Sequence, residues 1–428
     1  MLDMKNDKSI ERPLALTLKA ALSEYPVVTV FGPRQSGKTT LARMCCPDYD
    51  YVNLEDKETR ELAAGDYKSF FARHRAPLII DEIQRLPELV SAVQTIVDAD
   101  RDRSGQFILT GSQQSELAAA VDESLAGRTS VLDLMPLGLS ELSDDERSVS
   151  TDELLLKGFM PELWVKRMNP TSYYRNYFRT YVERDVRRLL NVKDLLRFER
   201  FVTLLAGRVG QVVNFTSLAN ETGVSSQTIS SWMSVLESSF LIYRLKPHFA
   251  NISKRMVKSP KIYFTEPGLA AYLLGIETPE QMARDPLRGQ LFENLVVMEA
   301  YKGFSNRGRD PRLAFLRTEK GFEIDLMIAE GSRFRPVEIK SSMTFGKALV
   351  KNLETYMDES DDGISPTLVY DGEPVESYGE HGIGVVNVRQ FFNERYHQGR
   401  KFQIDTYMGE CDGGISPTLG EIKVVKVL

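Results

Sequence analysis

The chain has 428 residues, of which 42% are hydrophobic and 27% are charged, a composition typical of a soluble globular protein with several domains. No apolar run approaches the ~20 residues that span a bilayer, and the polar N-terminus lacks an apolar signal core, so we expect a cytoplasmic protein with no membrane partner. The three cysteines have no metal-like spacing, which argues for a reducing compartment, and the four scattered histidines give little support to a metal site. The net charge of −6 does not indicate a nucleic-acid binder, although charge can be arranged locally.

The first distinctive stretch follows a short apolar run, 27–31, and leads into a helical segment. It contains Gly32, Pro33, Arg34, Gln35, Ser36, Gly37, Lys38, Thr39 and Thr40. Its two glycines allow backbone N–H groups to converge on one anion, and the helix N-terminus adds a positive end. Lys38 is expected to reach the outer phosphates and the Thr39 hydroxyl to bind Mg²⁺. The pattern predicts a site for a nucleoside triphosphate with Mg²⁺.

A second apolar run, 77–80, ends in two carboxylates, Asp81 and Glu82. Magnesium-assisted phosphoryl transfer needs such groups at the end of a buried strand. Asp81 is predicted to hold Mg²⁺ through water, opposite Thr39, and Glu82 to polarise the attacking water. Two exposed acids at a strand end are the alternative interpretation, and the phosphate loop upstream favours the catalytic one.

The run 106–109 leads into Thr110 and Ser112, whose hydroxyl groups are candidate sensors of the γ-phosphate. The alternating series implies a mostly parallel sheet covered by helices, with the ligand at the carboxyl ends of the strands. Arg128 is predicted to be an arginine finger for its own or a neighbour's nucleotide, or else a partner in a structural salt bridge. Small-molecule kinases share the loop, but the Asp-Glu pair favours hydrolysis.

The middle of the chain is expected to be helical, and residues 215–239 match a helix-turn-helix followed by a strand at 241–245, as in a winged helix. Residues 238–265 contain no acidic residue. Candidate DNA contacts on these elements are Gln227, Ser230, Arg244, Lys246, Lys254 and Arg255. A winged helix used only for packing between domains is the alternative.

The C-terminal half is expected to hold strands at 313–317, 322–328 and 335–339, then a helix and a further strand. Asp325 and the pair Glu338 and Lys340 place two carboxylates and an ammonium on neighbouring strands, with Glu293 near the start of the preceding helix. Such a group can bind Mg²⁺ and steady a water that attacks a phosphodiester. The alternative is an inert charge cluster on a nuclease-like scaffold. The tail partially repeats residues 355–368 and is expected to add no chemistry.

The order of these motifs resembles a prokaryotic family of AAA-type ATPases whose C-terminal half is the domain of unknown function 4143. The resemblance covers roughly residues 10 to 390. Its residues are Gly32-Pro33-Arg34-Gln35, Gly37-Lys38-Thr39-Thr40, Leu54-Glu55, Asp81-Glu82-Ile83-Gln84, Thr110-Gly111-Ser112, Leu125-Ala126-Gly127-Arg128, Lys261-Ile262-Tyr263-Phe264, Phe292-Glu293-Asn294 and Glu338-Ile339-Lys340. It implies an ATP-binding domain and a C-terminal fold similar to restriction endonucleases. Glu266 and Met160 depart from the family pattern.

Together these features predict an α/β protein with a P-loop NTPase sheet, a helical and winged-helix region, and a restriction-endonuclease-like α/β domain. The expected boundaries are 1–145, 146–275, 276–395 and a tail at 396–428. The favoured function is a Mg²⁺-dependent ATPase that repositions a DNA-contacting winged helix and a nuclease-like domain. The alternative is a slow nucleotide-gated switch that binds a protein partner, with an inactive nuclease-like domain. A homo-oligomer is compatible with both.

Overall fold

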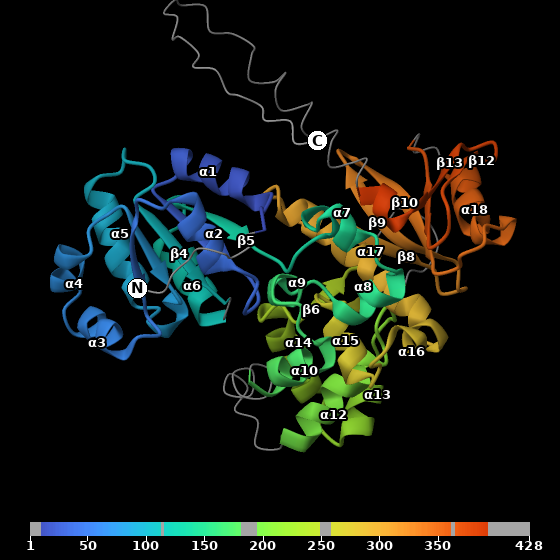
Figure 1. Ribbon diagram of the computed structural model, residues 1–428, viewed down its shortest axis with the longest axis horizontal. Helices are drawn as coiled ribbons and strands as arrows, with labels where there is room; N and C mark the ends of the chain where they lie inside the picture. The colour runs from blue at the N-terminus through green and yellow to red at the C-terminus, as the bar shows by residue number, and fades with distance from the viewer. Residues whose placement is uncertain (1–9, 113–114, 181–194, 249–257, 361–363, 393–428) are drawn as a thin grey trace, which may run out of the picture.

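The computed structural model describes residues 10–112, 115–180, 195–248, 258–360 and 364–392. Two of the predicted DNA contacts, Lys254 and Arg255, and the partly repeated tail lie outside these ranges. Figure 1 shows an N-terminal unit and a C-terminal sheet at opposite ends of the molecule, with the helices of the middle region between and below them. No helix in the described parts of the chain combines the length and the apolar composition that crossing a bilayer requires.

The N-terminal unit is built on a five-stranded sheet in the order β2-β3-β4-β1-β5, in which every pair is parallel. Its strands are β1 (Val27–Phe31), β2 (Asp50–Asn53), β3 (Leu78–Asp81), β4 (Phe107–Gly111) and β5 (Thr129–Asp133). Its helices are α1 (Leu14–Glu24), α2 (Lys38–Cys45), α3 (Lys57–Gly65), α4 (Tyr67–Arg73), α5 (Leu89–Ala99) and α6 (Ser115–Ser124), with a short 3₁₀ turn η1 (Ile83–Arg85). This is the predicted parallel sheet of a P-loop NTPase.

Helices cover both faces of this sheet because successive strand residues point to opposite sides. On β1, Val28 and Val30 join a core with residues of α1 and α2. Val27 and Phe31 instead join the larger core, to which α5 and α6 contribute. Since β4 lies between β1 and β3, the carboxyl ends of these three strands meet at one edge of the sheet, where a ligand of such a fold binds.

The middle region is mainly helical and contains one two-stranded antiparallel sheet, β6–β7. Its elements are η2 (Leu139–Glu141), α7 (Asp144–Arg147), α8 (Thr151–Lys157), α9 (Pro161–Val165), α10 (Pro170–Tyr177), α12 (Leu195–Ala206), α13 (Phe215–Thr222), α14 (Ser226–Ser238), β6 (Ile242–Leu245), β7 (Lys261–Phe264), α15 (Pro267–Leu273) and α16 (Pro279–Arg284). Gly223, with φ of +70°, ends α13, and the Ser225 hydroxyl caps α14 by accepting from the Thr228 amide at 3.1 Å. These two local signals produce the predicted helix–turn–helix.

The C-terminal unit holds a mixed six-stranded sheet in the order β12-β13-β11-β10-β9-β8. Its elements are α17 (Arg288–Ser305), β8 (Leu313–Arg317), β9 (Glu323–Glu330), β10 (Arg333–Lys340), η4 (Lys347–Leu349), α18 (Lys351–Glu359), β11 (Thr367–Tyr370), β12 (Val375–Tyr378) and β13 (Ile383–Asn387). The strands β8, β9 and β10 form an antiparallel meander, whereas β11 pairs in parallel with both β10 and β13. The second half of the molecule is therefore α/β, as predicted.

α17 connects the two ends of the molecule through buried polar contacts. Lys302 Nζ donates to the carbonyl of Leu137 at 2.7 Å and to Glu299 Oε1 at 2.8 Å. The amide of Leu139 donates to the other oxygen of Glu299 at 2.7 Å. The Ser305 hydroxyl donates to the carbonyl of Asp133 at 2.6 Å. The last turns of α17 therefore hold the segment that follows β5 in the N-terminal unit (Figure 1).

Candidate functional site

The glycine-rich loop lies between the end of β1 and the start of α2, at the carboxyl edge of the parallel sheet. Gly32 has a φ of +150°, and a Cβ at this position would lie 2.1 Å from the carbonyl oxygen of Leu134. Gly37 has a φ of +95° and precedes the first residue of α2. Both positions therefore require glycine, and the tight turn aims the N-terminus of α2 into the loop.

Lys38 is 6% exposed and points back into the loop. Its Nζ donates to the carbonyls of Gly32 at 3.0 Å and Pro33 at 2.8 Å. Burial lowers the pKa of the Lys38 ammonium to about 8, and the negative charges of Glu82 and Asp81 limit the fall. The ammonium is thus held among carbonyl groups at the place where phosphate oxygens are expected.

Asp81, at the end of β3, gathers hydroxyl groups from three other segments. The Thr39 hydroxyl lies 2.9 Å from Asp81 Oδ2 and 3.0 Å from Oδ1. Tyr51, on β2, donates to Oδ2 at 2.9 Å, and Thr110, at the end of β4, donates to Oδ1. Burial, followed by the charge of Asp81, raises the pKa of Tyr51 well above its usual range, so this hydroxyl stays a donor. The carboxylate is fixed in one orientation toward Thr39.

Glu82 follows in a left-handed conformation, with a φ of 58° that turns its side chain away from the strand direction. Burial raises the pKa of Glu82 above its usual value, and the Lys38 ammonium opposes the rise. Gln84 Nε2 donates to Glu82 Oε2 and, at 3.1 Å, to the Ser112 hydroxyl. One amide therefore joins the predicted catalytic carboxylate to one of the two predicted sensors.

The remaining loop residues contact groups that sequence reasoning missed. Arg12, which precedes α1, donates to the carbonyls of Ser36 at 2.8 Å and Met135 at 2.7 Å. The Tyr173 hydroxyl, on α10 of the middle region, donates to Gln35 Oε1 at 2.7 Å. The Ser36 hydroxyl is buried and has no hydrogen-bond partner among the described residues. Arg34 Nη2 lies 3.9 Å from Glu55 Oε1, and Thr40 is exposed.

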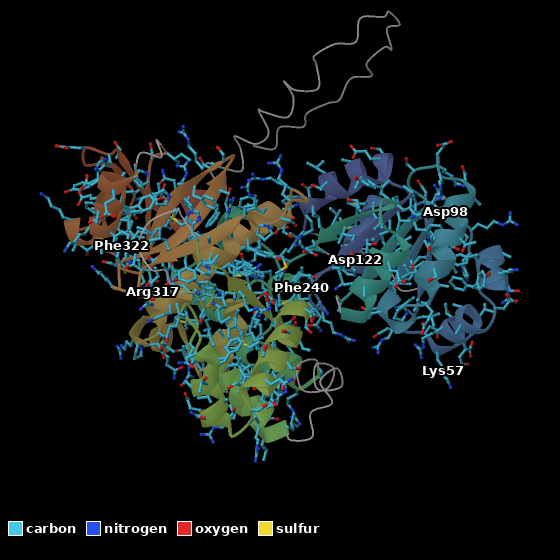
Figure 2. All side chains as sticks on the ribbon, turned by 180° about the vertical axis from the view of Figure 1, so that it is seen from behind. Lys57, Asp98, Asp122, Phe240, Arg317 and Phe322 are labelled. Atoms are coloured by element: carbon cyan, nitrogen blue, oxygen red, sulfur yellow. The ribbon has the colours of Figure 1, made fainter. Side chains whose placement is uncertain are left out.

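Arg128 lies at the opposite edge of the sheet from the loop, which corrects the hypothesis that it reaches the nucleotide of its own chain. It precedes β5, and its carbonyl accepts from the Val27 amide at the beginning of β1. Its guanidinium donates to both oxygens of Asp98, at 2.7 and 3.1 Å. Figure 2 shows Asp98 and Lys57, which follows the carboxyl end of β2, at opposite ends of this unit. The alternative interpretation, a structural salt bridge, describes its contacts within the chain.

The predicted DNA contacts on α14 face outward: Gln227 is exposed and Ser230 is half-buried. Lys246 is exposed after β6. Arg244 instead pairs with Glu237 of α14. Part of the positive charge of the acid-free segment is therefore compensated by an acid that lies just before it.

The four predicted nuclease residues lie together at the edge where β9 and β10 face α17. Lys340 Nζ lies 2.9 Å from Asp325 Oδ2 and 2.8 Å from Glu338 Oε1. Glu293, on α17, receives a hydrogen bond at 2.6 Å from the hydroxyl of Tyr263. Burial, followed by the charge of Asp325, raises the pKa of Glu338 to about 8, and the Lys340 ammonium opposes this. Among the described residues, no group of three or more His, Cys, Asp or Glu side chains is arranged to hold a metal ion.

A second lysine, Lys261 at the start of β7, also enters this group. Its Nζ lies 2.8 Å from Glu293 Oε1, 2.6 Å from Glu323 Oε1 and 4.0 Å from Asp325 Oδ1. Burial lowers the pKa of Lys261, but the charges of Glu293, Asp325 and Glu323 outweigh it, so that the pKa lies above its usual value. The sequence placed Lys261 among the basic residues of the acid-free segment 238–265 and not in this group, because its distance from the other members in the sequence conceals the contact.

Family comparisons divide the chain into three consecutive matches. Residues 24–143 match an AAA domain family, residues 149–280 a domain of unknown function (DUF8612), and residues 288–391 a domain of unknown function (DUF4143). The AAA match covers the phosphate loop, Asp81, Glu82 and Thr110. The N-terminal unit is therefore a P-loop ATPase domain of the AAA type.

Similar proteins and structures include curated relatives and archaeal ATPases. An uncharacterized protein of Mycobacterium tuberculosis is 31% identical over 338 residues, which cover 78% of this chain and 74% of that protein. An uncharacterized protein of Haemophilus influenzae is 25% identical, with 65% of this chain and 75% of that protein covered. The Walker-type ATPase PABY2304 of Pyrococcus abyssi aligns at 15% identity and a TM-score of 0.38, covering 63% of this chain and 99% of that one.

The mycobacterial relative matches most of both chains, and the AAA and DUF4143 matches follow one another in the order that the motifs predict. The chain belongs to the same protein family as this mycobacterial relative, and it joins an N-terminal AAA-type P-loop ATPase domain to a C-terminal DUF4143 domain.

Proposed function

We propose that the protein binds ATP with Mg²⁺ in the N-terminal unit, hydrolyses it, and uses the nucleotide state to reposition the middle region and the C-terminal unit. The observation that carries this proposal is the contact between the Thr39 hydroxyl and the Asp81 carboxylate, 2.9 Å apart at the carboxyl edge of the sheet. Both groups are oxygen ligands of the kind that Mg²⁺ prefers, and they lie beside the buried ammonium of Lys38.

The residues of the site fit a magnesium–triphosphate. Mg²⁺ would be held by the Thr39 hydroxyl directly and by Asp81 through water, and it would neutralise charge on the phosphates as the terminal bond breaks. Lys38 would exchange its two carbonyl partners for phosphate oxygens. Thr110 and Tyr51 orient the Asp81 carboxylate by donating hydrogen bonds to it.

Glu82 would orient and polarise the attacking water. Burial raises the pKa of Glu82 even though the Lys38 ammonium opposes the rise, and a raised pKa suits a group that must accept a proton during the reaction. Gln84 links Glu82 to Ser112, so a change at the γ-phosphate could reach the carboxylate through one side chain. Arg128 could act only on the nucleotide of a neighbouring copy, in a homo-oligomer.

The ATPase proposal is tested by Glu82→Gln with Glu88→Gln as its matched control, since Glu88 is exposed at the start of α5. We expect Glu82→Gln to lower ATP turnover by at least about a hundredfold, the range for loss of a general base, and to leave ATP binding intact. Glu88→Gln should turn over ATP at the wild-type rate. Equal turnover by wild type and Glu82→Gln, measured as phosphate release, would contradict the proposal.

We further propose that the middle and C-terminal parts form separate domains, divided near residues 145 and 275, and that the outer face of α14 contacts DNA. Gln227 is exposed in the first turn of α14, and Lys246 is exposed just after β6.

Contacts between lysine side chains and DNA phosphates release counterions, so affinity for duplex DNA should fall steeply between about 50 and 200 mM salt. Lys246→Ala should weaken binding to all sequences alike and lower the salt slope. An affinity for DNA that does not change with salt would show that this surface does not contact DNA phosphates.

The C-terminal unit is proposed to have a restriction-endonuclease-like fold, because one helix, three antiparallel strands, a second helix and a parallel strand follow one another as α17, β8, β9, β10, α18 and β11. The contacts of Lys261 favour the alternative in which this unit does not cleave DNA and the protein acts as a nucleotide-gated switch toward a protein partner. Fold and activity are separate questions here.

A further inference from the structure

We propose that Lys261 is a resident cation of the C-terminal carboxylate group and that its ammonium excludes the divalent metal that a nuclease would need there. The inference goes beyond ATP hydrolysis and does not depend on it. It concerns four carboxylates and three cations, which we call the ammonium cluster. The cluster consists of Glu293, Glu323, Asp325, Glu338, Lys261, Lys340 and Arg317.

The ammonium of Lys261 occupies the centre of three of these carboxylates. It lies 2.8 Å from Glu293 and 2.6 Å from Glu323, both within hydrogen-bonding distance, and 4.0 Å from Asp325. Lys261 itself is 2% exposed. A metal ion bound by the same oxygens would have to displace a buried, triply paired charge, and uncoupling such a charge from its partners is costly.

Two further carboxylate oxygens of the cluster, Asp325 Oδ2 and Glu338 Oε1, are also engaged. Asp325 Oδ2 accepts from Lys340 Nζ and from the Ile339 amide, both at 2.9 Å. Glu338 Oε1 accepts from Lys340 and, at 3.2 Å, from Asn352 Nδ2. Glu338 Oε2 is a fully buried oxygen of the cluster that has no hydrogen-bond partner among the described residues. A divalent ion that used Asp325 Oδ2 or Glu338 Oε1 would have to displace the Lys340 ammonium, so the residues as arranged do not fit a metal.

Charge leads to the same conclusion. Four carboxylates face the two lysines and Arg317, whose Nη1 lies 3.2 Å from Glu323 Oε2. With every group ionised the four carboxylates and three cations leave the cluster one net negative charge. Sites for divalent cations instead gather carboxylates that are not already neutralised. Figure 2 shows Arg317 at the outer part of the C-terminal unit, close to Phe322.

The position of Lys261 is fixed by main-chain contacts on both sides of β7. The strand pairs with β6 on one side, and on the other the Val213 amide donates to the Pro260 carbonyl at 3.2 Å. Farther along, Asn294 of α17 donates to the Phe264 carbonyl at 2.9 Å and accepts from its amide at 2.7 Å. Because the backbone is held at both ends of β7, the ammonium belongs to the folded structure of the cluster.

The test measures Mn²⁺ binding to the full-length, nucleotide-free protein at pH 8 by electron paramagnetic resonance. Lys261→Met removes the charge and keeps most of the side chain, and Lys258→Met, at an exposed position on the same segment, is its matched control. We expect Lys261→Met to bind Mn²⁺ at least tenfold more tightly than wild type or Lys258→Met. The gain should vanish in Lys261→Met/Glu338→Gln, which excludes binding at Asp81 as its source.

Two outcomes would overturn the proposal. One is a Glu338-dependent Mn²⁺ site in the wild-type protein as tight as that of Lys261→Met. The other is a folded Lys261→Met that gains no Mn²⁺ site. If circular dichroism shows that Lys261→Met does not fold, the wild-type protein decides the question. A wild-type Mn²⁺ site or DNA cleavage activity that Asp325→Asn and Glu338→Gln abolish would overturn the proposal. The absence of both from the wild-type protein would support it. ATP turnover, recorded on the same samples, reports separately on the N-terminal site.

Discussion

The charged side chain of Lys38 is buried. In the protein without nucleotide, carbonyl dipoles are its only direct hydrogen-bond partners among the described residues, and burial lowers its pKa to about 8. A triphosphate would surround the same ammonium with negative oxygens, which favour its protonated form. Nucleotide binding and protonation of this one side chain are therefore linked.

This linkage predicts proton uptake on ATP binding at alkaline pH. At pH 9 the free protein holds Lys38 mostly neutral, because its pKa is about 8, whereas the bound protein holds it charged. ATP binding should take up a fraction of a proton at pH 9 and almost none at pH 7. Calorimetry in two buffers of different ionisation enthalpy measures the uptake, and Lys38→Met should show none. Identical heats in both buffers at pH 9 would contradict the prediction.

At the scale of single residues, the sequence predicted the residues of the phosphate loop but not the side chains that support them. Lys38, Thr39 and Asp81 follow from local spacing, since each occupies a set place at the end of a strand or the start of a helix. Tyr51 and Arg12 reach the site only through the strand order and the path of the chain before α1. Neither has a local signal, because their contacts join residues 30 and 24 positions apart.

At the scale of elements, α10 and the phosphate loop form a joint between the middle region and the ATPase domain. The hydroxyl of Tyr173, a residue 4% exposed, holds Gln35 at a loop position whose φ is +64°. Left-handed conformations at residues other than glycine need support from their surroundings. The hydrogen bond from α10 supplies part of that support.

Tyr173→Phe should therefore weaken ATP binding about threefold to tenfold, the equivalent of one hydrogen bond of roughly 1 kcal/mol. The matched control is Tyr49→Phe, because the Tyr49 hydroxyl donates to the carbonyl of Gly105, in the same domain, at 2.7 Å. Affinity for a fluorescent ATP analogue measures both. If both variants lose affinity equally, the contact with Gln35 has no specific effect on the loop.

Elements with an uninterrupted apolar or periodic pattern were predicted well, and two strands with a weaker pattern were missed. The predicted apolar run at 27–31 is β1 and the predicted strand at 313–317 is β8, both with the same bounds, and α13 and α14 together fill the predicted helix-turn-helix at 215–239 to within a residue. β12 and β13 were not predicted, because Val375–Tyr378 has polar residues at its centre and Ile383–Asn387 is interrupted by Gly384. β6 was predicted at 241–245, and its pairing with β7 depended on the fold.

At the scale of the whole molecule, the buried pair on α17 fastens the two ends together. Lys302 and Glu299 are each 2% exposed by side chain, and both bind main-chain groups of the segment after β5. Lys302 also lies 4.2 Å from the ring of Phe159. Removing one member leaves a buried charge without its partner, which costs far more than the pair contributes.

Lys302→Met should lower the free energy of unfolding by about 3–5 kcal/mol, whereas the exposed Lys351→Met should change it by less than about 0.5 kcal/mol. Lys302→Met/Glu299→Leu should recover much of the loss, because it removes both charges. Urea unfolding followed by tryptophan fluorescence measures all three. A single substitution no more harmful than Lys351→Met would show that the pair is not needed to hold the units together.

The length of α17 has a practical consequence for work with fragments. Its 18 residues extend about 27 Å, from the ammonium cluster near Glu293 to the contacts of Lys302 and Ser305 with the ATPase domain. Cutting the chain before α17 would remove the ATPase domain, which covers the C-terminal end of this helix. Side chains such as Lys302, which are buried in the intact protein, would then be exposed to solvent. Truncated C-terminal pieces should therefore aggregate or fray, and assays of DNA or metal binding belong on the intact polypeptide.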